Sequence, residues 1–380
     1  MADSNVGLAV GCGMDSGDGV FTELAADEMV VLYPTFAHLE PDGETWRVAV
    51  AGAVLQPDQV RLGSRILIRM LRRAMKVAAE ALLTDIFRQR IRDFAASTQR
   101  GKRVAVGVGE ATFFLRKPTK HNGHFAGSFR LTREEIEPLE AAGHVRDGWL
   151  HFRVVPPNGD EREFRGRALL VGRTGLSIIS DIDDTLKHSE VTCRQTLLAN
   201  TFLRDFQNVP GMSNLYQEWA RQRAAFHYVS SSPWQLFRPL AEFFAADEFP
   251  AGTFHLRPFR LRNHLLLRLF MIRRIGKAEV IKSILRTFPE RQFVLIGDSG
   301  ERDPEIYGSV ARMFPGQVVA IYIRDLPVRP LDEARASKAF RQLPPSLWRT
   351  FREPAELLGQ FAAVPASAAI STPCLVPPDA

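Results

Sequence analysis

Residues 176–185 read Leu-Ser-Ile-Ile-Ser-Asp-Ile-Asp-Asp-Thr, an apolar run that leads directly into three carboxylates. Carboxylates this close repel one another, and each loses solvation when it follows a buried strand. A divalent cation offsets both effects, and Mg²⁺ prefers carboxylate and water ligands. Ligands of open α/β sheets bind beyond the carboxyl ends of the strands. We therefore expect Asp181 and Asp183 at that edge of a parallel sheet, beside a Mg²⁺ site.

Three stretches further along the chain also place polar residues where an apolar run ends. Residues 226–234, Phe-His-Tyr-Val-Ser-Ser-Ser-Pro-Trp, read as a strand that ends at Ser230. Lys277 stands just ahead of a helical pattern over residues 278–288. Another apolar run leads into Gly-Asp at Asp298, and Asp303 follows in the same loop. A serine hydroxyl and the amides of a helix start can bind an anion, so these strand ends predict an anion site beside the carboxylates.

Short β-branched or aromatic runs alternate with helical stretches from Arg173 onward. The runs are LSIIS, FHYVS, TFHL, FVLIG and VVAIYI. Their alternation predicts an α/β domain, a parallel sheet covered by helices, over residues 173–328. The chain after Asp325 is rich in Pro, Ala and Arg, so we expect residues 329–380 to form an extension with little fold of its own.

The first half of the chain has a different pattern. Over residues 29–172, runs such as WRVAVAG and LHFRVV alternate apolar and polar side chains, which predicts a β-rich, sandwich-like domain with one solvated face. Residues 64–94 interrupt this pattern with apolar residues at helical spacing, as one long helix or two shorter ones. The apolar stripe of this helical segment either packs on the β-rich domain or contacts a membrane. Residues 1–28 are rich in Gly, Asp and Ser and predict a flexible tail.

Length and composition limit the class of protein. The chain has 380 residues, 45% hydrophobic and 24% charged, which fits a globular protein of two domains. No apolar run reaches the length of a membrane span, and no basic segment precedes an early apolar patch, so we expect neither a spanning helix nor a signal peptide. Three distant cysteines give no disulfide framework or zinc site, which favours the reducing cytoplasm.

Positive charge is concentrated in two segments. Residues 61–103 hold twelve Lys or Arg against three acids, and residues 255–277 hold seven against none. Clustered cations bind phosphate groups, whether on nucleic acid, an anionic lipid or a phosphorylated substrate. The mixed Leu, Phe, Met and Arg of residues 260–274 can lie at a membrane interface, with Arg268, Arg273 and Arg274 in contact with lipid. The same composition also fits a core helix with solvated arginines.

The four strand-end motifs, DxDxT, Ser, Lys and GDxxxxD, resemble in order those of the haloacid dehalogenase superfamily of phosphotransferases. Longer stretches are similar to the actin-patch type of phosphatidate phosphatase, and more distantly to lipins. These are SDIDDTLKHS at 180–189, NVPGM at 208–212, FHYVSSSPWQL at 226–236, FHLRPFRL at 254–261 and FVLIGDSGERDPEIY at 293–307. The resemblance is dense over residues 173–326 and implies a Rossmann-like catalytic domain of the haloacid dehalogenase type.

The resemblance also implies roles for the acidic residues. Asp181 would be the nucleophile that forms an aspartyl-phosphate. Asp183 would be the general acid and then the base, which requires its pKa to be raised by its neighbours. Mg²⁺ would be held by Asp181, the backbone carbonyl of Asp183, and Asp298, with Asp303 orienting bound water. Asp303 is followed by proline and equally fits a helix N-cap.

Phosphate contacts are implied for Thr185, Ser230 and Lys277. Ser230 is preferred over its two neighbouring serines because it ends the strand, and Ser232 with Pro233 reads as the start of a helix. Lys282 is the alternative to Lys277 but lies within the following helix. Lys187 and His188 could line the mouth of the site.

Only about forty residues separate Thr185 from the next strand, enough for a flap but not for a large cap domain. An uncapped site suits a large substrate such as a lipid in a bilayer. The implied function is a Mg²⁺-dependent phosphatidate phosphatase, cytoplasmic and peripherally bound to an anionic membrane surface, with no nucleic-acid partner. The alternatives are an uncapped phosphatase for another phosphomonoester (a nucleic-acid end, a phosphoprotein or a metabolite) and a non-catalytic phosphatidate-binding module.

Overall fold

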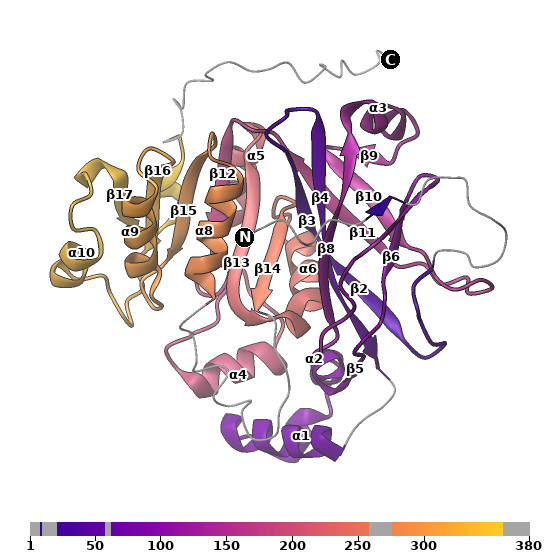
Figure 1. Cartoon of the computed structure of the whole chain (residues 1–380). Coiled ribbons are helices and arrows are strands. Elements are labelled where there is room, and N and C mark those ends of the chain that lie inside the picture. Colours follow the sequence, from indigo (N-terminus) through magenta and orange to yellow (C-terminus); the bar gives the residue numbers. More distant parts are fainter. Residues whose placement is uncertain (1–7, 10–20, 58–61, 258–275, 360–380) are drawn as a thin grey trace, which may run out of the picture.

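The computed structural model describes residues 8–9, 21–57, 62–257 and 276–359, which form two β-sheets and the helices around them (Figure 1). One sheet is parallel and is built from the second half of the chain. The other is mixed and is built from the first half. The chain is therefore mixed α/β, as the two sequence patterns predict.

The parallel sheet has six strands in the order β14-β13-β12-β15-β16-β17. All five neighbouring pairs are parallel. Its central strands are apolar and almost wholly buried, as expected where helices cover both faces of a sheet. The strands are β12 (Leu176–Ser180), β13 (Ala225–Pro233), β14 (Thr253–Arg257), β15 (Gln292–Asp298), β16 (Val318–Arg324) and β17 (Trp348–Phe351).

Helices cover the parallel sheet on both faces (Figure 1). One face packs on α8 and α9 through residues such as Ile284 and Val310. The other packs on α5 and α6 through residues such as Tyr216 and Phe244. The helices of this half are α4 (Arg194–Phe202), α5 (Met212–Arg221), α6 (Phe237–Ala246), α8 (Lys277–Thr287), α9 (Asp303–Met313) and α10 (Glu333–Ala339).

The mixed sheet confirms the β-rich pattern of the first half. Its neighbouring strands are antiparallel except for β11 and β3, which pair in parallel. Residues 105–114 form a hairpin of two strands that turns at Gly109, whose φ is +55°. The strands are β1 (Leu8–Ala9), β2 (Met29–Tyr33), β3 (Thr35–Leu39), β4 (Thr45–Gln56), β5 (Ser97–Thr98), β6 (Ala105–Val108), β7 (Ala111–Phe114), β8 (His124–Thr132), β9 (Val145–Arg146), β10 (Trp149–Val154) and β11 (Arg165–Val171). A short helix, α3 (Arg133–Ala141), follows β8.

The helical interruption consists of α1 (Leu62–Met75), a 3₁₀ turn η1 (Ala79–Leu82) and α2 (Asp85–Ala95). Lys76 directly follows α1, and its left-handed φ of +55° ends the helix. Of the stripe predicted from the sequence, Leu67 and Leu71 are buried. They pack beside α4, a helix of the second half, so the stripe contributes to a core between the two halves.

The two halves share that core. One continuous cluster joins Leu55 of β4 and Phe94 of α2 to Ile178 of β12 and Phe202 of α4. Elsewhere the two sheets approach closely, and the amide of Phe254 donates to the carbonyl of Pro34 at 3.1 Å. The first half is therefore packed against the second half.

Two expectations about the ends of the chain are corrected. Residues 326–359 do not lack structure, because α10 covers α9 and β17 adds a sixth parallel strand beside β16. The tail predicted for residues 1–28 is anchored at its end, since Thr22 is fully buried and exchanges hydrogen bonds with Ala105. Within the described residues, no helix is both long and apolar enough to span a membrane.

Candidate active site

Asp181 follows β12 directly and remains attached to the sheet. Its amide donates to the carbonyl of Ile296 in β15 at 2.9 Å, so the side chain emerges at the carboxyl edge between the two central strands. The chain then reverses at Asp184, a left-handed residue with φ +56°. The Asp184 carboxylate accepts the amides of residues 189–191 and fixes the loop that follows. Asp184 is therefore structural.

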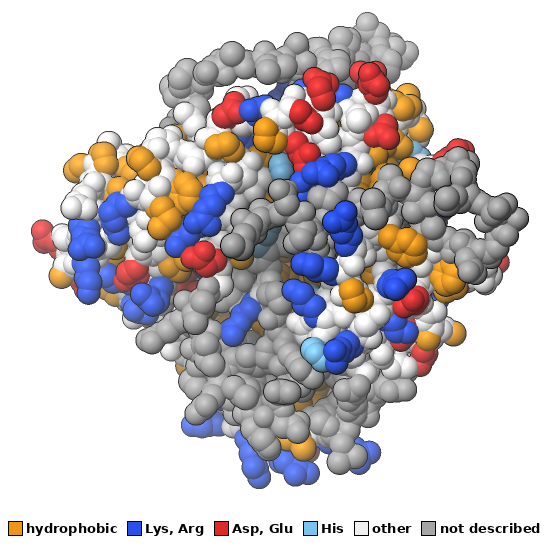
Figure 2. All heavy atoms as spheres, in the orientation of Figure 1, with side chains coloured by type: hydrophobic (Ala, Val, Ile, Leu, Met, Phe, Trp, Pro, Cys, Tyr) orange, Lys and Arg blue, Asp and Glu red, His pale blue; other side chains and the backbone are white. Residues whose placement is uncertain are grey.

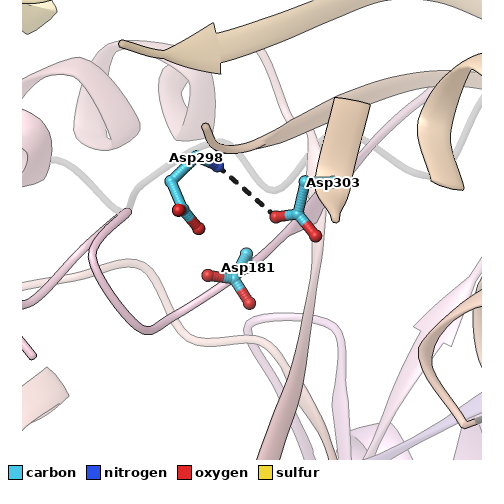
Figure 3. A group of neighbouring side chains, drawn as sticks. All are labelled: Asp181, Asp298 and Asp303. Carbon is cyan, nitrogen blue, oxygen red and sulfur yellow. Dashed lines mark hydrogen bonds between the residues drawn. The ribbon is translucent and has the colours of Figure 1, made fainter. Parts of the chain in front are cut away.

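Three carboxylates from different parts of the sequence meet at this edge (Figure 3). Asp181 follows β12, Asp298 ends β15 and Asp303 opens α9, and their oxygens lie within 4.8 Å of one another. All three are buried. Gly297 makes the approach possible, because a Cβ at that position would lie 2.1 Å from Oδ2 of Asp303. The structure thus brings the acidic residues of the DxD and GDxxxxD motifs together at one edge of the sheet.

Lys277 is the buried cation of this carboxylate group. It opens α8, and its Nζ donates to Oδ1 of Asp181 at 2.7 Å and to Oδ1 of Asp303 at 2.5 Å. Burial opposes the charge of the lysine, but Asp181 and Asp303 outweigh it and raise the pKa of Lys277 well above its usual value. One ammonium faces three carboxylates, so negative charge predominates here.

Asp298 is the least compensated of the three carboxylates. Its Oδ1 accepts the amide of Glu301 at 3.0 Å, whereas its buried Oδ2 has no hydrogen-bond partner among the described residues. Burial, followed by the charges of Asp303 and Asp181, raises its pKa well above the usual value. Burial likewise raises the pKa of Asp181, despite Lys277. A buried acceptor without a donor among clustered oxygen ligands fits a divalent cation.

Asp183 lies in a contrasting environment. Its Oδ1 accepts Nζ of Lys187 at 2.6 Å and Oγ of Ser189 at 2.8 Å. Its Oδ2 accepts Oγ of Ser230 at 2.9 Å and Oγ of Ser232 at 2.7 Å. Burial alone would raise its pKa, but Lys187 and the hydroxyls outweigh it and hold the pKa well below its usual range. In this arrangement Asp183 is ionised, whereas the sequence interpretation required a raised pKa.

The residues implied as phosphate contacts lie beside the two aspartates. The hydroxyl of Thr185 donates to Oδ2 of Asp181 at 3.2 Å. Ser230 accepts the amide of Ser232 at 2.9 Å while donating to Asp183. Ser230, Thr185 and Lys277 are all buried, and Lys277 bridges to the carboxylate group. All seven residues predicted for the site in the described part of the sequence therefore meet at one edge of the sheet.

Lys187, Ser189 and Ser232 also belong to the site, although the sequence motifs imply a catalytic role for none of them. Lys187 lies four residues after Asp183, and the turn at Asp184 brings it back to that carboxylate. The interpretation of Ser232 as a helix cap is wrong, because β13 continues to Pro233, and Pro233 is the N-cap of the 3₁₀ turn η2 (Trp234–Leu236) that precedes α6. Its hydroxyl contacts Asp183 instead.

For several further residues, the sequence leaves two roles open, and the structure shows which contacts each residue makes. Asp303 is the first residue of α9, and its carboxylate serves the site and not the helix end. Lys282 pairs with Glu279 on its own helix, which supports Lys277. His188 is exposed. The arginines expected at a membrane, Arg268, Arg273 and Arg274, lie outside the described residues.

The segment that forms this site is similar to a known protein family. Residues 176–325 match the family described as phosphatidate phosphatase APP1, catalytic domain. This segment is similar to the catalytic domain of the actin-patch type of phosphatidate phosphatase. The prediction made from the motifs is thereby confirmed. The match starts at the first residue of β12 and ends just after β16, so it contains both aspartates of the DxD motif and the Asp298 loop.

Two curated relatives of this family segment are similar to the chain. Phosphatidate phosphatase APP1 of Saccharomyces cerevisiae is 38% identical over 154 residues, and an uncharacterized protein of Schizosaccharomyces pombe is 35% identical over 161 residues. These alignments cover 40% and 41% of this chain and 26% of each relative. The chain thus spans about a quarter of the length of the curated relatives it matches.

Proposed function

We propose that this protein is a Mg²⁺-dependent phosphatidate phosphatase that releases phosphate from phosphatidate and leaves diacylglycerol. The observation that carries the proposal is the buried group of Asp181, Lys277, Asp303 and Asp298 beside Asp183. The group lies within the segment that matches the phosphatidate phosphatase catalytic domain. A parallel sheet with carboxylates at the ends of its two central strands supports a domain of the haloacid dehalogenase type.

Asp181 is the nucleophile of the proposed reaction. A carboxylate oxygen of Asp181 attacks phosphorus, and the bond from phosphorus to the glycerol oxygen breaks. Lys277 and Thr185 already contact this carboxylate, so they are placed to hold the transferring phosphoryl group in line. When bound by Asp181, Asp298, Asp303 and the backbone carbonyl of Asp183, Mg²⁺ would neutralise phosphoryl charge.

Asp183 transfers the proton in both half-reactions. It gives a proton to the departing glycerol oxygen, and in the second step it takes one from the water that attacks the aspartyl-phosphate. The donors around Asp183 favour its ionised form, which suits the second step. The incoming phosphate is an anion and competes for the same lysine and hydroxyls, so it raises the pKa of Asp183 for the first step. Ser230 then donates to phosphate.

We propose two units within the chain, the β-rich residues 29–172 and a catalytic unit from 173 that extends past the expected boundary at 328 through β17. The proposed substrate lies in a membrane, and the enzyme would act from the cytoplasm as a peripheral protein. In support, the described chain places no large cap domain between Thr185 and β13, only α4 and α5. Arg268, Arg273 and Arg274 remain proposed lipid contacts outside the described residues.

Phosphate release from phosphatidate in detergent micelles tests the function, measured with Mg²⁺ and with EDTA. The control substrates are soluble phosphomonoesters. Asp181→Asn removes the nucleophile, and Asp147→Asn is a matched control in an exposed turn of the other half. We expect Mg²⁺-dependent release from phosphatidate that only Asp181→Asn abolishes. Release from soluble esters alone would reject the lipid substrate, and no release from any substrate would favour a binding module.

A further inference from the structure

The outward side of α1 and α2 is strongly basic. Five exposed cations lie on or directly after α1, which contains no acidic residue. The exposed cations of α2 are Arg88, which pairs with Asp85 at 3.0 Å, and Arg92. Figure 2 shows blue side chains gathered at the lower end of the molecule, where Figure 1 shows α1. We call this surface the basic helical face: Arg65, Arg69, Arg72, Arg73, Lys76 and Arg88.

Apolar groups accompany these cations on the surface. Leu83, between η1 and α2, is 66% exposed, and Ile66 on α1 is 43% exposed. Between α1 and α2 lies a groove of about 480 Å³. Its apolar lining includes Ile68, Leu82 and Phe87, and four arginines of the basic helical face also line it. A groove lined by apolar side chains and guanidinium groups complements the acyl chains and headgroup of an anionic lipid.

The inner side of the same helices is already occupied. Leu67, Leu71 and Met75 are almost completely buried in the core shared with α4. The side chain of Thr84 caps α2 by accepting the amide of Phe87. α1 and α2 are therefore held as a fixed platform, and the basic helical face is the side that remains available to a partner.

Side-chain contacts link this platform to the catalytic residues. The guanidinium of Arg90, on the buried side of α2, lies 3.7 Å from the ring centre of Phe206. Nζ of Lys187 lies 4.7 Å from the same ring and also binds Asp183. α4, which packs on α1 and α2, follows the loop that begins at Asp181. The basic helical face is thus at the carboxyl end of the parallel strands, the end that a lipid substrate must reach.

We propose that the basic helical face docks the protein on an anionic lipid bilayer, with Leu83 inserted among the lipids. The inference rests on the proposed phosphatidate phosphatase activity, because it places the membrane at the site of that reaction. Attraction between arginines and lipid phosphates favours binding to an anionic surface. Transfer of an apolar side chain from water into the bilayer adds a further favourable contribution. A rigid basic surface with a protruding leucine combines both contributions.

Binding to vesicles tests the surface without turnover. The vesicles are phosphatidylcholine alone, or phosphatidylcholine mixed four to one with phosphatidylglycerol, which is anionic but is not a phosphomonoester. The variants of the full chain are Arg65→Glu/Arg69→Glu/Arg72→Glu and, separately, Leu83→Ser. The matched control, Lys338→Glu/Arg341→Glu/Arg349→Glu, reverses the same number of exposed charges around α10 and β17.

We expect the wild-type protein and the control to bind the anionic vesicles and to bind the neutral ones much more weakly. The α1 triple variant should lose about 100-fold in partitioning, equivalent to about 1 kcal/mol per arginine. Leu83→Ser should lose about tenfold at unchanged charge. Hydrolysis of a soluble phosphomonoester should be unchanged in every variant, which separates docking from catalysis and folding.

Three outcomes would overturn the docking surface. They are equal loss in the two triple variants, unchanged binding in the α1 triple variant, and self-association of the wild type that the α1 triple variant abolishes. If phosphatidate is not hydrolysed but the α1 triple variant still loses vesicle binding, the docking surface stands and the proposed activity fails.

Discussion

The two aspartates of the DxD motif, two residues apart, have opposite electrostatic surroundings. Asp181 shares one lysine with Asp303, lies near Asp298, and its pKa is raised by burial and by the other carboxylates. Asp183 has a lysine to itself and three serine hydroxyls, and its pKa is lowered. Both are buried. The ratio of hydrogen-bond donors to carboxylates therefore decides the difference in pKa between the two aspartates.

The largest effect should come from exchanging each carboxylate for an amide. Asp181→Asn loses the nucleophile, so turnover should fall by at least about 1000-fold and no phosphate should remain on the protein after an acid quench. Asp183→Asn should lose similar turnover but retain acid-stable radioactive phosphate on Asp181, because hydrolysis of the intermediate lacks its base. Label on both variants, or on neither, would contradict the assigned division of roles.

Removal of Lys187, which pairs with Asp183, should make the electrostatic surroundings of Asp183 more similar to those of Asp181. In Lys187→Met we expect kcat to fall about 100-fold. Lys187 lowers the pKa of Asp183, so its loss raises that pKa, and the acidic limb of the kcat profile should move to higher pH. Lys282→Met, a half-buried lysine of α8 outside the site, is the control. A lower kcat with an unmoved pH profile would assign Lys187 a structural role only.

Replacing Asp298 should change the stability of the protein in opposite directions without and with Mg²⁺. In Asp298→Asn, repulsion with Asp181 and Asp303 disappears, so the free energy of unfolding without Mg²⁺ should increase, by about 1 kcal/mol. The stabilisation added by Mg²⁺ should be lost at the same time. Thermal unfolding with EDTA and with Mg²⁺ measures both effects. A variant that is less stable than wild type in EDTA would mean that Asp298 contributes favourable contacts without the cation.

Buried histidines provide a smaller, separate test of burial as the cause of shifted pKa values. Burial, with a contribution from Lys120, lowers the pKa of His124 to about 4. The unfolded chain takes up this proton near pH 6.5, whereas the folded chain does not, so stability is present above pH 6.5 and is lost as pH falls toward 4. His124→Asn should reduce the loss of unfolding free energy between pH 7 and 5 by about 2 kcal/mol. An unchanged pH dependence would contradict the burial of His124.

The core of the site could be predicted because parallel strands converge. Once β12 and β15 were recognised, the carboxylates after them had to meet at one edge, and Lys277 opened a helix beside them. Ser189 could not be predicted, and Lys187 only as a residue at the mouth of the site, because their contacts with Asp183 depend on a left-handed turn at Asp184. That conformation is uncommon for residues other than glycine, and one Asp within a run of acidic residues does not predict it.

The end of the parallel sheet shows the same limit. β17 has only four residues, Trp-Arg-Thr-Phe, too few to display an alternation. It forms a strand because the exposed edge of β16 offers unpaired backbone groups, a tertiary reason that is invisible in a local window. Prolines and alanines around it suggested an extension, although α10 packs on α9 beside it.

The core shared by the two halves has a consequence for how the catalytic segment can be handled. A cut before residue 176 would remove Leu55, Leu71 and Phe94 from the core that also contains Phe202 and Ile178, and would expose apolar surface of that core. Exposed patches of this kind promote aggregation. We therefore expect that residues 176–325 alone would not fold stably. The segment that matches the family is smaller than the unit that shares one hydrophobic core.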